Sequence, residues 1–238
     1  LVAVTGGTGF IGSHTVARLL AHGHTVRVLV RDPAKAHRVL RAVGVDPDQV
    51  QLVTGDMGDA ARVAQLLDGA EAVVHAAAAI GVTGPRSDLV AQNVHGMENV
   101  VGAAVARGLD PVIHLSTVAV FVPPDAPVIT TSSRLASPRN EYGRSKVQAE
   151  RDLRALQDGG APVVIVYPGG VLGPDQPHLD ATLEGIAGAH PPPYALPHPV
   201  DVLRDEVGAR TRDADGGGGV DHRLGAVEEL RHARGIAH

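Results

Sequence analysis

A tyrosine and a lysine four residues apart are the clearest candidates for chemistry in this sequence. The stretch EYGRSKVQAE (141–150) holds Tyr142, one of three tyrosines in the chain, and Lys146, one of two lysines. Residues four apart on an α-helix share a face, so the phenol and the ammonium can point into one cleft. A free phenol, with a pKa of about 10, is a poor acid or base at neutral pH, but a nearby ammonium favours the phenolate. The pair therefore predicts an acid–base site in which Lys146 lowers the pKa of Tyr142.

A hydroxyl group at the end of a strand could complete this site. The segment HLSTVAVF (114–121) overlaps the end of a predicted strand and offers Ser116 and Thr117. Open α/β sheets bind ligands at the carboxyl ends of their strands, so either hydroxyl could orient a substrate oxygen. Serine and threonine also satisfy backbone groups at strand ends without any catalytic role. The residues alone leave this choice open.

A glycine-rich turn near the N-terminus predicts a cofactor site. The stretch VTGGTGFIG (4–12) places its glycines where a predicted strand turns into a predicted helix, which is the context that makes the pattern informative. A dinucleotide diphosphate needs backbone N–H groups close by and no Cβ in the way, and a helix N-terminus adds a favourable partial positive charge. We therefore predict that the cofactor contacts Gly6, Gly9, Phe10, Ile11 and Gly12.

The end of the second predicted strand should distinguish NADP(H) from NAD(H). An acidic residue there would accept hydrogen bonds from the ribose hydroxyls and repel a 2′-phosphate. The position is occupied by Val30, and Arg31 follows it. A guanidinium can bind the 2′-phosphate through paired charged hydrogen bonds, which favours NADP(H) and leaves NAD(H) as the second choice. Two alternatives stay open: Asp32 could rotate in and select NAD(H), or Arg31 could be a solvated surface charge.

Short apolar runs alternate with stretches of helical period over the first three quarters of the chain. Strict β–α alternation with short connections predicts an α/β fold, a Rossmann-type doubly wound parallel sheet, in a dinucleotide-binding domain of residues 1–175. The composition, poor in aromatics and rich in Val, Ala, Leu and Ile, suits strands buried on both faces. The predicted strands are 1–5, 25–30, 50–54, 71–77, 111–117 and 162–167, and the predicted helices are 10–22, 33–43, 59–67, 87–107 and 140–157.

The alternation stops after about residue 188. The prolines of HPPPYALPHP (190–199) exclude a helix and disfavour a central strand, and RTRDADGGGG (210–219) is polar and flexible. We expect residues 176–238 to form a truncated or irregular C-terminal substrate-binding region.

Seven short motifs follow one another in an informative order: TGGTGFIG, GDMGD, VVHAAA, NVHGMENV, LSTVAVF, YGRSK and YPGGVLGP. In this order they resemble the extended short-chain dehydrogenase/reductase family, also called the NAD-dependent epimerase/dehydratase family, over roughly residues 1–175. The resemblance implies a Rossmann domain, a nicotinamide cofactor and a Ser/Thr–Tyr–Lys catalytic set.

The resemblance also implies roles for single residues. Thr117 lies four residues before the aromatic that closes VAVF, so the implied catalytic set is Thr117, Tyr142 and Lys146. Tyr167 stands where the family usually has an arginine, which could remove a charge from the cleft. Beside the glycine turn and Arg31, the residues implied to lie at the cofactor are Asp56, Met57, His75, Ala76, Ala77, Asn93, Tyr142, Lys146 and Tyr167.

Two of these implied residues carry further interpretations. Asn93 is implied to hold the active-site geometry. Asp56 could accept a hydrogen bond from the adenine amino group, or it could simply cap the following helix.

The implied reaction is hydride transfer between the nicotinamide and a carbonyl or alcohol substrate, as in dihydroflavonol-reductase-like members of the family. Tyr142 would exchange a proton with the substrate oxygen, Thr117 would orient that oxygen, and Lys146 would also hold the ribose. Dehydratases of the family carry an acid/base pair after the strand hydroxyl, whereas this chain has Val118 and Ala119, which disfavours dehydration. A nucleotide-sugar epimerase and a non-catalytic NADP-sensing protein are the alternatives, although such sensors typically lose the Tyr–Lys pair.

The composition excludes several other classes of function. With a net charge of −5 and scattered arginines, the chain has no electrostatic footprint for nucleic acid. It has no cysteine, and its 13 histidines form no convincing metal cluster on a predicted helix. Nothing resembles a signal peptide, and no apolar stretch reaches the roughly 20 residues that span a bilayer. We expect a cytoplasmic protein with a small-molecule substrate, no metal, no nucleic-acid or membrane partner, and a homodimer built on the helices at 87–107 and 140–157, as in many relatives.

Overall fold

The computed structural model of the chain describes residues 1–79, 91–138 and 141–175. All of them belong to one compact unit, Leu1–Asp180. The predictions for residues 176–238 and for the start of the helix at 87–107 lie outside the described residues. The proposed division of the chain at residue 175 therefore stays a prediction.

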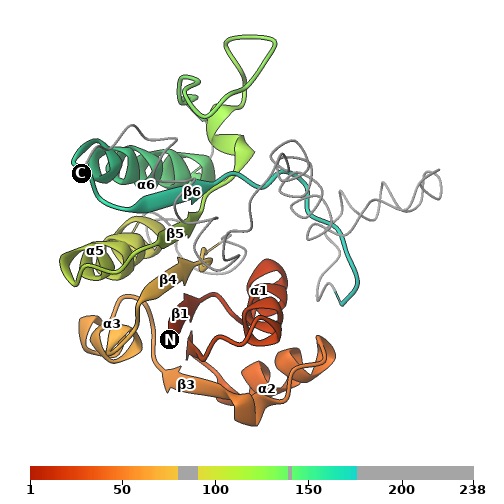
Figure 1. The fold of residues 1–238 in the computed structure, drawn as a ribbon. Helices are drawn as coiled ribbons and strands as arrows, with labels where there is room; N and C mark the ends of the chain where they lie inside the picture. The colour runs from red at the N-terminus through yellow and green to blue at the C-terminus, as the bar shows by residue number, and fades with distance from the viewer. Residues whose placement is uncertain (80–90, 139–140, 176–238) are drawn as a thin grey trace, which may run out of the picture. The chain divides into compact units, whose positions relative to one another are not determined.

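The described strands form a six-stranded parallel sheet in the order β3-β2-β1-β4-β5-β6 (Figure 1). The chain runs outward from β1 to β3, returns to place β4 beside β1, and then runs outward to β6 on the other side. This order confirms the predicted Rossmann-type fold, which binds ligands where the strand order reverses. The strands are β1 (Val2–Thr5), β2 (Val26–Val30), β3 (Val50–Thr54), β4 (Ala72–His75), β5 (Val112–Leu115) and β6 (Val163–Val166).

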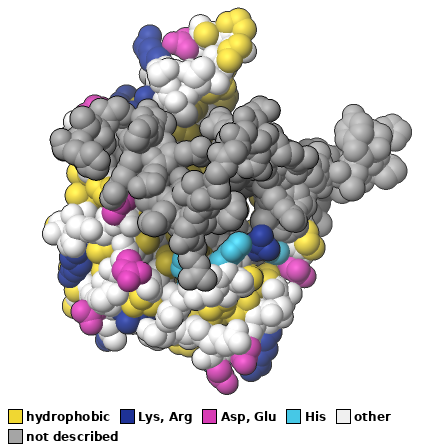
Figure 2. All heavy atoms as spheres, viewed as in Figure 1, with side chains coloured by type: hydrophobic (Ala, Val, Ile, Leu, Met, Phe, Trp, Pro, Cys, Tyr) yellow, Lys and Arg dark blue, Asp and Glu magenta, His cyan; other side chains and the backbone are white. Residues whose placement is uncertain are grey.

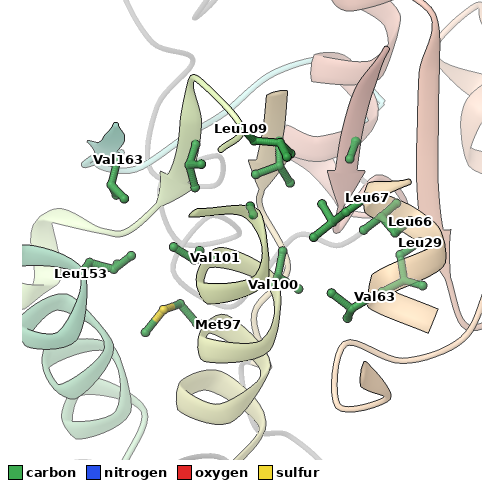
Figure 3. Packing of buried hydrophobic residues seen from close by; sticks show 14 of the residues in the cluster. Leu29, Val63, Leu66, Leu67, Met97, Val100, Val101, Leu109, Leu153 and Val163 are labelled. Carbon is green, nitrogen blue, oxygen red and sulfur yellow. The ribbon is translucent and has the colours of Figure 1, made fainter. Parts of the chain in front are cut away.

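Helices pack on both faces of the sheet (Figure 1). Successive residues of a strand point to opposite faces. Val2 and Val4 therefore pack in one cluster with Val16 and Leu40 of the helices on that face. Ala3 belongs to the second cluster, part of which is drawn in Figure 3. The first face carries α1 (Phe10–Ala21) and α2 (Pro33–Ala42), and the second carries α3 (Ala60–Leu67), α5 (Ala103–Ala106) and α6 (Glu141–Asp158).

The predicted helix at 87–107 differs in detail from the structure. Its described part consists of two wide-turned π-helical segments, η2 (Ala91–His95) and η3 (Glu98–Gly102), followed by α5. The apolar spacing in the sequence predicts a helix but does not distinguish α from π turns. Gly96 lies between the two segments, and a Cβ there would come within 2.7 Å of the Met57 Cγ. The helix is thus pressed against the loop that follows β3.

Aspartates fix where two of the helices begin. Asp32 accepts a hydrogen bond from the Lys35 N–H at 3.0 Å, with Pro33 in the first turn of α2. Asp59 accepts from the N–H groups of Ala61 and Arg62 at the start of α3. Each cap contributes about 1 kcal/mol to stability. The caps hold the loops after β2 and β3 in place at the carboxyl edge of the sheet.

Two short 3₁₀ helices complete the described fold, η1 (Pro47–Gln49) and η4 (Val118–Phe121). The segment between η4 and α6 extends away from the sheet, and hydrophobic side chains gather at its tip (Figures 1 and 2). Val128 there is 71% exposed. Of the helices described, none has the length and apolar character needed to cross a membrane.

Candidate functional site

A cleft of about 510 Å³ lies at the carboxyl edge of the sheet, lined mainly by residues at or after the ends of β1 to β6 and by the start of α6. Its volume is in the range of pockets that bind small molecules and cofactors. The structure brings most of the predicted site residues together in this one cleft. Those that line it are Gly6, Gly9, Phe10, Ile11, Gly12, Arg31, Asp56, Met57, Ala76, Ala77, Tyr142 and Lys146.

The glycine turn leaves bare backbone at the cleft wall. Gly6 has a φ of +74°, and a Cβ on it would lie 2.5 Å from the carbonyl carbon of Ala76. A Cβ on Gly12 would lie 2.1 Å from the Gly6 carbonyl oxygen. No side chain among the described residues caps α1, and its first turn carries no acidic residue. The turn is therefore a cradle that a Cβ would fill, beside helix N–H groups suited to a diphosphate.

This close approach gives a first testable prediction. Gly6→Ala is expected to weaken dinucleotide binding at least about tenfold, because the added Cβ meets backbone and the left-handed φ strains any L side chain. Fluorescence titration with reduced dinucleotide measures the affinity, and circular dichroism verifies folding. Gly102→Ala is the matched control, since a Cβ there meets nothing within 4 Å. Unchanged affinity in folded Gly6→Ala would exclude this turn as the cofactor site.

The end of the cleft beside β2 and β3 carries positive charge. Arg31 and Lys35 both line it, whereas the Asp32 carboxylate caps α2. The hydrogen bond from the Lys35 N–H is the main reason why the pKa of Asp32 lies below its ordinary value. Lys35 was not predicted; it lies in the first turn of α2, whereas Arg31 precedes the residue that caps this helix.

Asp56 lies in a turn at the same end of the cleft. Its carboxylate accepts from the Gly58 N–H at 2.9 Å, while Asp59, three residues later, caps α3. The interpretation of Asp56 as the cap of the following helix is therefore wrong. Its predicted contact with the adenine stays a prediction.

Tyr142 and Lys146 reach the opposite end of the cleft from one face of α6. Lys146 is buried, and its Nζ donates to the Leu115 carbonyl at the end of β5, at 3.2 Å. Burial lowers the pKa of Lys146 to about 8, and the charge of Glu150 opposes this shift. The pKa of Tyr142, in contrast, is raised by its burial. The expected lowering of the Tyr142 pKa is thus corrected: loss of water around the phenol dominates, and the ammonium is directed to a strand-end carbonyl.

The two candidate hydroxyls lie in different surroundings. Ser116 lines the cleft, and its Oγ donates to Oε2 of Glu150 at 2.8 Å. Thr117 begins η4, and its Oγ1 accepts from the Ala119 N–H at 3.2 Å. Thr117 is not among the described residues that line the cleft, yet its hydroxyl keeps its own hydrogen to donate. Its role in orienting a substrate oxygen stays a prediction.

Asn93 lies behind the cleft wall and connects two of its sides. Its amide makes paired hydrogen bonds with the backbone of Ala79, at 2.7 and 2.9 Å, and donates to Ser145 Oγ at 3.0 Å. Ser145 in turn donates to the Tyr142 carbonyl at 2.8 Å. Asn93 thus links the segment after β4 to the helical turn that carries Tyr142, although it does not line the cleft itself.

His75 supports the strand ends beneath the cleft instead of lining it. Its Nδ1 lies 2.7 Å from Thr5 Oγ1, which also accepts from the Ala77 N–H at 3.3 Å. These contacts tie the end of β1 to the end of β4 and to the segment that follows it. Burial lowers the pKa of His75 to about 3, so the ring is neutral. The ring of His114 on β5 lies 5.1 Å away, centroid to centroid.

Tyr167 also lies outside the described lining of the cleft. Its hydroxyl donates to Oε1 of Glu150, and burial together with that carboxylate raises the pKa of Tyr167 to about 12. Arg154 donates to the same oxygen from its Nε at 3.0 Å. A guanidinium is therefore present near this position although Tyr167 stands where the family usually has arginine. The sequence reasoning missed Glu150 and Arg154, which follow Lys146 on one helix face at four-residue intervals.

Comparison with known proteins agrees with this fold. The model of the NAD dependent epimerase/dehydratase family matches residues 2–187, and the chain belongs to that family. UDP-arabinose 4-epimerase 1 of Arabidopsis thaliana is 30% identical over 83% of this chain and 47% of its own length. The 2-alkyl-3-oxoalkanoate reductase of Shewanella oneidensis is 32% identical over 74% of this chain and 46% of its own.

A solved structure supports the same assignment. A double mutant of the dTDP-glucose 4,6-dehydratase from Streptomyces venezuelae, crystallised with NAD, has a TM-score of 0.63 and 34% identity, covering 74% of this chain and 57% of that one. The chain spans about half the length of the curated relatives that it matches. The predicted family resemblance is thereby confirmed.

Proposed function

We propose that the protein is an NAD(P)-dependent oxidoreductase that reduces a carbonyl group of a small molecule to an alcohol. The observation that carries this proposal is that Tyr142 and Lys146 line the same cleft as the glycine turn. Burial raises the pKa of Tyr142, so the phenol is protonated at neutral pH and can act as the acid in carbonyl reduction. The reductase relative, which by its name acts on an oxo acid, supports a carbonyl substrate.

The residues of the cleft suit a nicotinamide dinucleotide, which would supply the hydride when bound. The backbone of Gly6 and Gly9 and the N-terminus of α1 would hold the diphosphate. Lys146, at the other end, would donate hydrogen bonds to the nicotinamide ribose. Tyr142 would donate its hydroxyl proton to the carbonyl oxygen, and the Thr117 hydroxyl would orient that oxygen.

A substrate panel tests this proposal. Purified protein is supplied with reduced dinucleotide and with aldehydes, ketones and 3-oxo acids, and dinucleotide oxidation is followed by absorbance. We expect substrate-dependent oxidation for at least one of these classes. Binding of the dinucleotide without turnover on any of them would instead support a non-catalytic sensor.

We further propose that NADP(H) is preferred, through the charge at the β2 end of the cleft. Arg31 and Lys35 line it, and Asp32 is engaged in capping α2. The double variant Arg31→Ala, Lys35→Met is expected to lose about 10- to 100-fold in NADPH affinity and little in NADH affinity, because a 2′-phosphate loses two cationic partners. Arg41→Ala, an exposed arginine in the last turn of α2, is the control. Equal losses for both dinucleotides would contradict the preference.

Nucleotide-sugar epimerisation is the second candidate, favoured by the similarity to UDP-arabinose 4-epimerase 1. It predicts that the purified protein retains oxidised dinucleotide and interconverts UDP-sugars without net dinucleotide turnover. The homodimer, the cytoplasmic location and the absence of a nucleic-acid partner stay predictions.

A further inference from the structure

A fully buried carboxylate lies directly behind the cleft. Glu150 is 0% exposed and follows Lys146 by one turn of α6. Its Oε2 accepts from Ser116 Oγ at 2.8 Å, and its Oε1 accepts from Arg154 Nε at 3.0 Å and from the Tyr167 hydroxyl. Three donors suit a group that only accepts, and they offset the cost of removing a carboxylate from water.

Arg154 is itself held in place. One of its Nη atoms donates to the Thr131 carbonyl at 3.1 Å, and its guanidinium carbon lies 5.6 Å from the centre of the Phe121 ring. The ion pair of Arg154 and Glu150 thereby joins α6 to the segment between η4 and α6. A buried ion pair with this many fixed partners has a defined geometry, although such pairs contribute little net stability.

Glu150 is also the negative charge that acts on Lys146. Two histidines, His75 on β4 and His114 on β5, interact electrostatically with Lys146. Burial lowers the pKa of both, so both rings remain neutral. Burial drives the Lys146 amine towards its neutral form, and the Glu150 charge opposes this. Arg154 and Tyr167 bond the Glu150 carboxylate, and neither is among the described residues that line the cleft. On α6 itself, Tyr142 precedes Lys146 by one turn and remains protonated.

We propose that Glu150, held by Arg154 and Tyr167, is a positioning residue that keeps Lys146 protonated and fixes the Ser116 hydroxyl at the cleft wall. This inference deepens the proposed function and rests on it for its consequence in catalysis. Glu150 thereby sets the pH above which Lys146 loses its proton and donates hydrogen bonds to a ribose less well. The proposal stands on geometry: the buried carboxylate lies one helical turn after Lys146, and three side chains, those of Ser116, Arg154 and Tyr167, donate to its two oxygens.

The two lysines of the chain make a direct test feasible. Protein labelled with ¹³C-lysine gives two side-chain signals, which Lys35→Arg assigns, and their titration is followed by NMR without any turnover. In the wild type we expect Lys146 to titrate near pH 8. Glu150→Gln is expected to move this midpoint down by at least about one pH unit, because the opposing carboxylate is gone. Asp158→Asn removes an exposed carboxylate at the end of the same helix and should leave the midpoint in place.

A second variant covers the case in which Glu150→Gln does not fold. The double variant Glu150→Gln, Arg154→Met removes both charges of the pair, so no charge is left buried alone. It should also lower the Lys146 midpoint, but by less than Glu150→Gln does, because loss of the more distant Arg154 charge acts in the opposite direction. An unchanged Lys146 midpoint in either folded variant would overturn the proposal. Absence of carbonyl reduction, with the midpoint shifted as expected, would instead contradict only the proposed function.

The pH dependence of binding gives a second readout on the same proteins. Dinucleotide affinity should fall as the pH rises through the Lys146 midpoint, since the neutral amine donates fewer and weaker hydrogen bonds. In Glu150→Gln this fall should begin at a correspondingly lower pH. A binding profile that coincides with that of the wild type would count against the proposed role of Glu150.

Discussion

Replacing Tyr142 by phenylalanine is expected to reduce carbonyl turnover about 10²- to 10⁴-fold, the usual contribution of a positioned acid. The half-buried phenol is protonated, and it lies on the face of α6 that lines the cleft. Phenylalanine keeps the ring and removes only the proton donor. Dinucleotide affinity should therefore change less than about threefold. Steady-state kinetics and a binding titration on the same preparation measure both effects.

The control for this substitution removes a hydroxyl far from the cleft. Ser132→Ala deletes an exposed hydroxyl in the segment between η4 and α6 and should leave the rate within about twofold. Tyr142→Phe with more than a tenth of the wild-type rate would show that another group protonates the substrate.

Replacing Lys146 by methionine is expected to abolish most activity and at the same time to stabilise the fold. Burial lowers the pKa of Lys146 from 10.5 to about 8, so the unfolded chain holds this proton more tightly than the folded protein does. The wild type is therefore destabilised by the full amount below about pH 8. This destabilisation disappears as the pH rises towards 10.5, the ordinary pKa of lysine. Residual solvent around the amine and the charge of Glu150 both reduce this cost. Lys146→Met should therefore raise the unfolding free energy by about 1–3 kcal/mol at pH 7.

Urea denaturation at pH 7 and pH 10 measures this difference. The gain from Lys146→Met should shrink at the higher pH, because the wild-type amine is then neutral in the folded protein. Lys35→Met, the same change at an exposed position, should alter the unfolding free energy by less than about 0.5 kcal/mol at both values. A Lys146→Met protein that is less stable than the wild type at pH 7 would contradict the cost ascribed to the buried ammonium.

The sheet and the glycine turn were predictable because their causes are local in the sequence. Runs such as LVAVT and TVRVLV fit strands buried on both faces, and the structure has strands at both positions. The turn at 6–12 needs glycines for close backbone approach, which a sequence displays directly. The Tyr142 and Lys146 spacing likewise indicated a shared helix face, and both residues line the cleft.

The electrostatics of the site were not predictable from spacing alone. The four-residue interval indicates that Lys146 can act on Tyr142. The direction of the Tyr142 pKa shift, however, depends on the burial of each group. The partners of Glu150 come from the residue after β5, from α6 and from the residue after β6, so only the folded sheet brings them together. The choice of Asp32 between capping and cofactor binding likewise depends on where α2 begins.

The proposed reaction delivers a hydride and a proton to one carbonyl group at the Tyr142 end of the cleft. The most direct measurement is the mass of the alcohol formed when both C4 hydrogens of the preferred reduced dinucleotide are replaced by deuterium, so that either face delivers label. We expect the alcohol formed by the wild type to be one mass unit heavier than with unlabelled dinucleotide. Tyr142→Phe should bind the dinucleotide yet form almost no alcohol. Product of unchanged mass, or equal product from the two proteins, would contradict the proposed reaction.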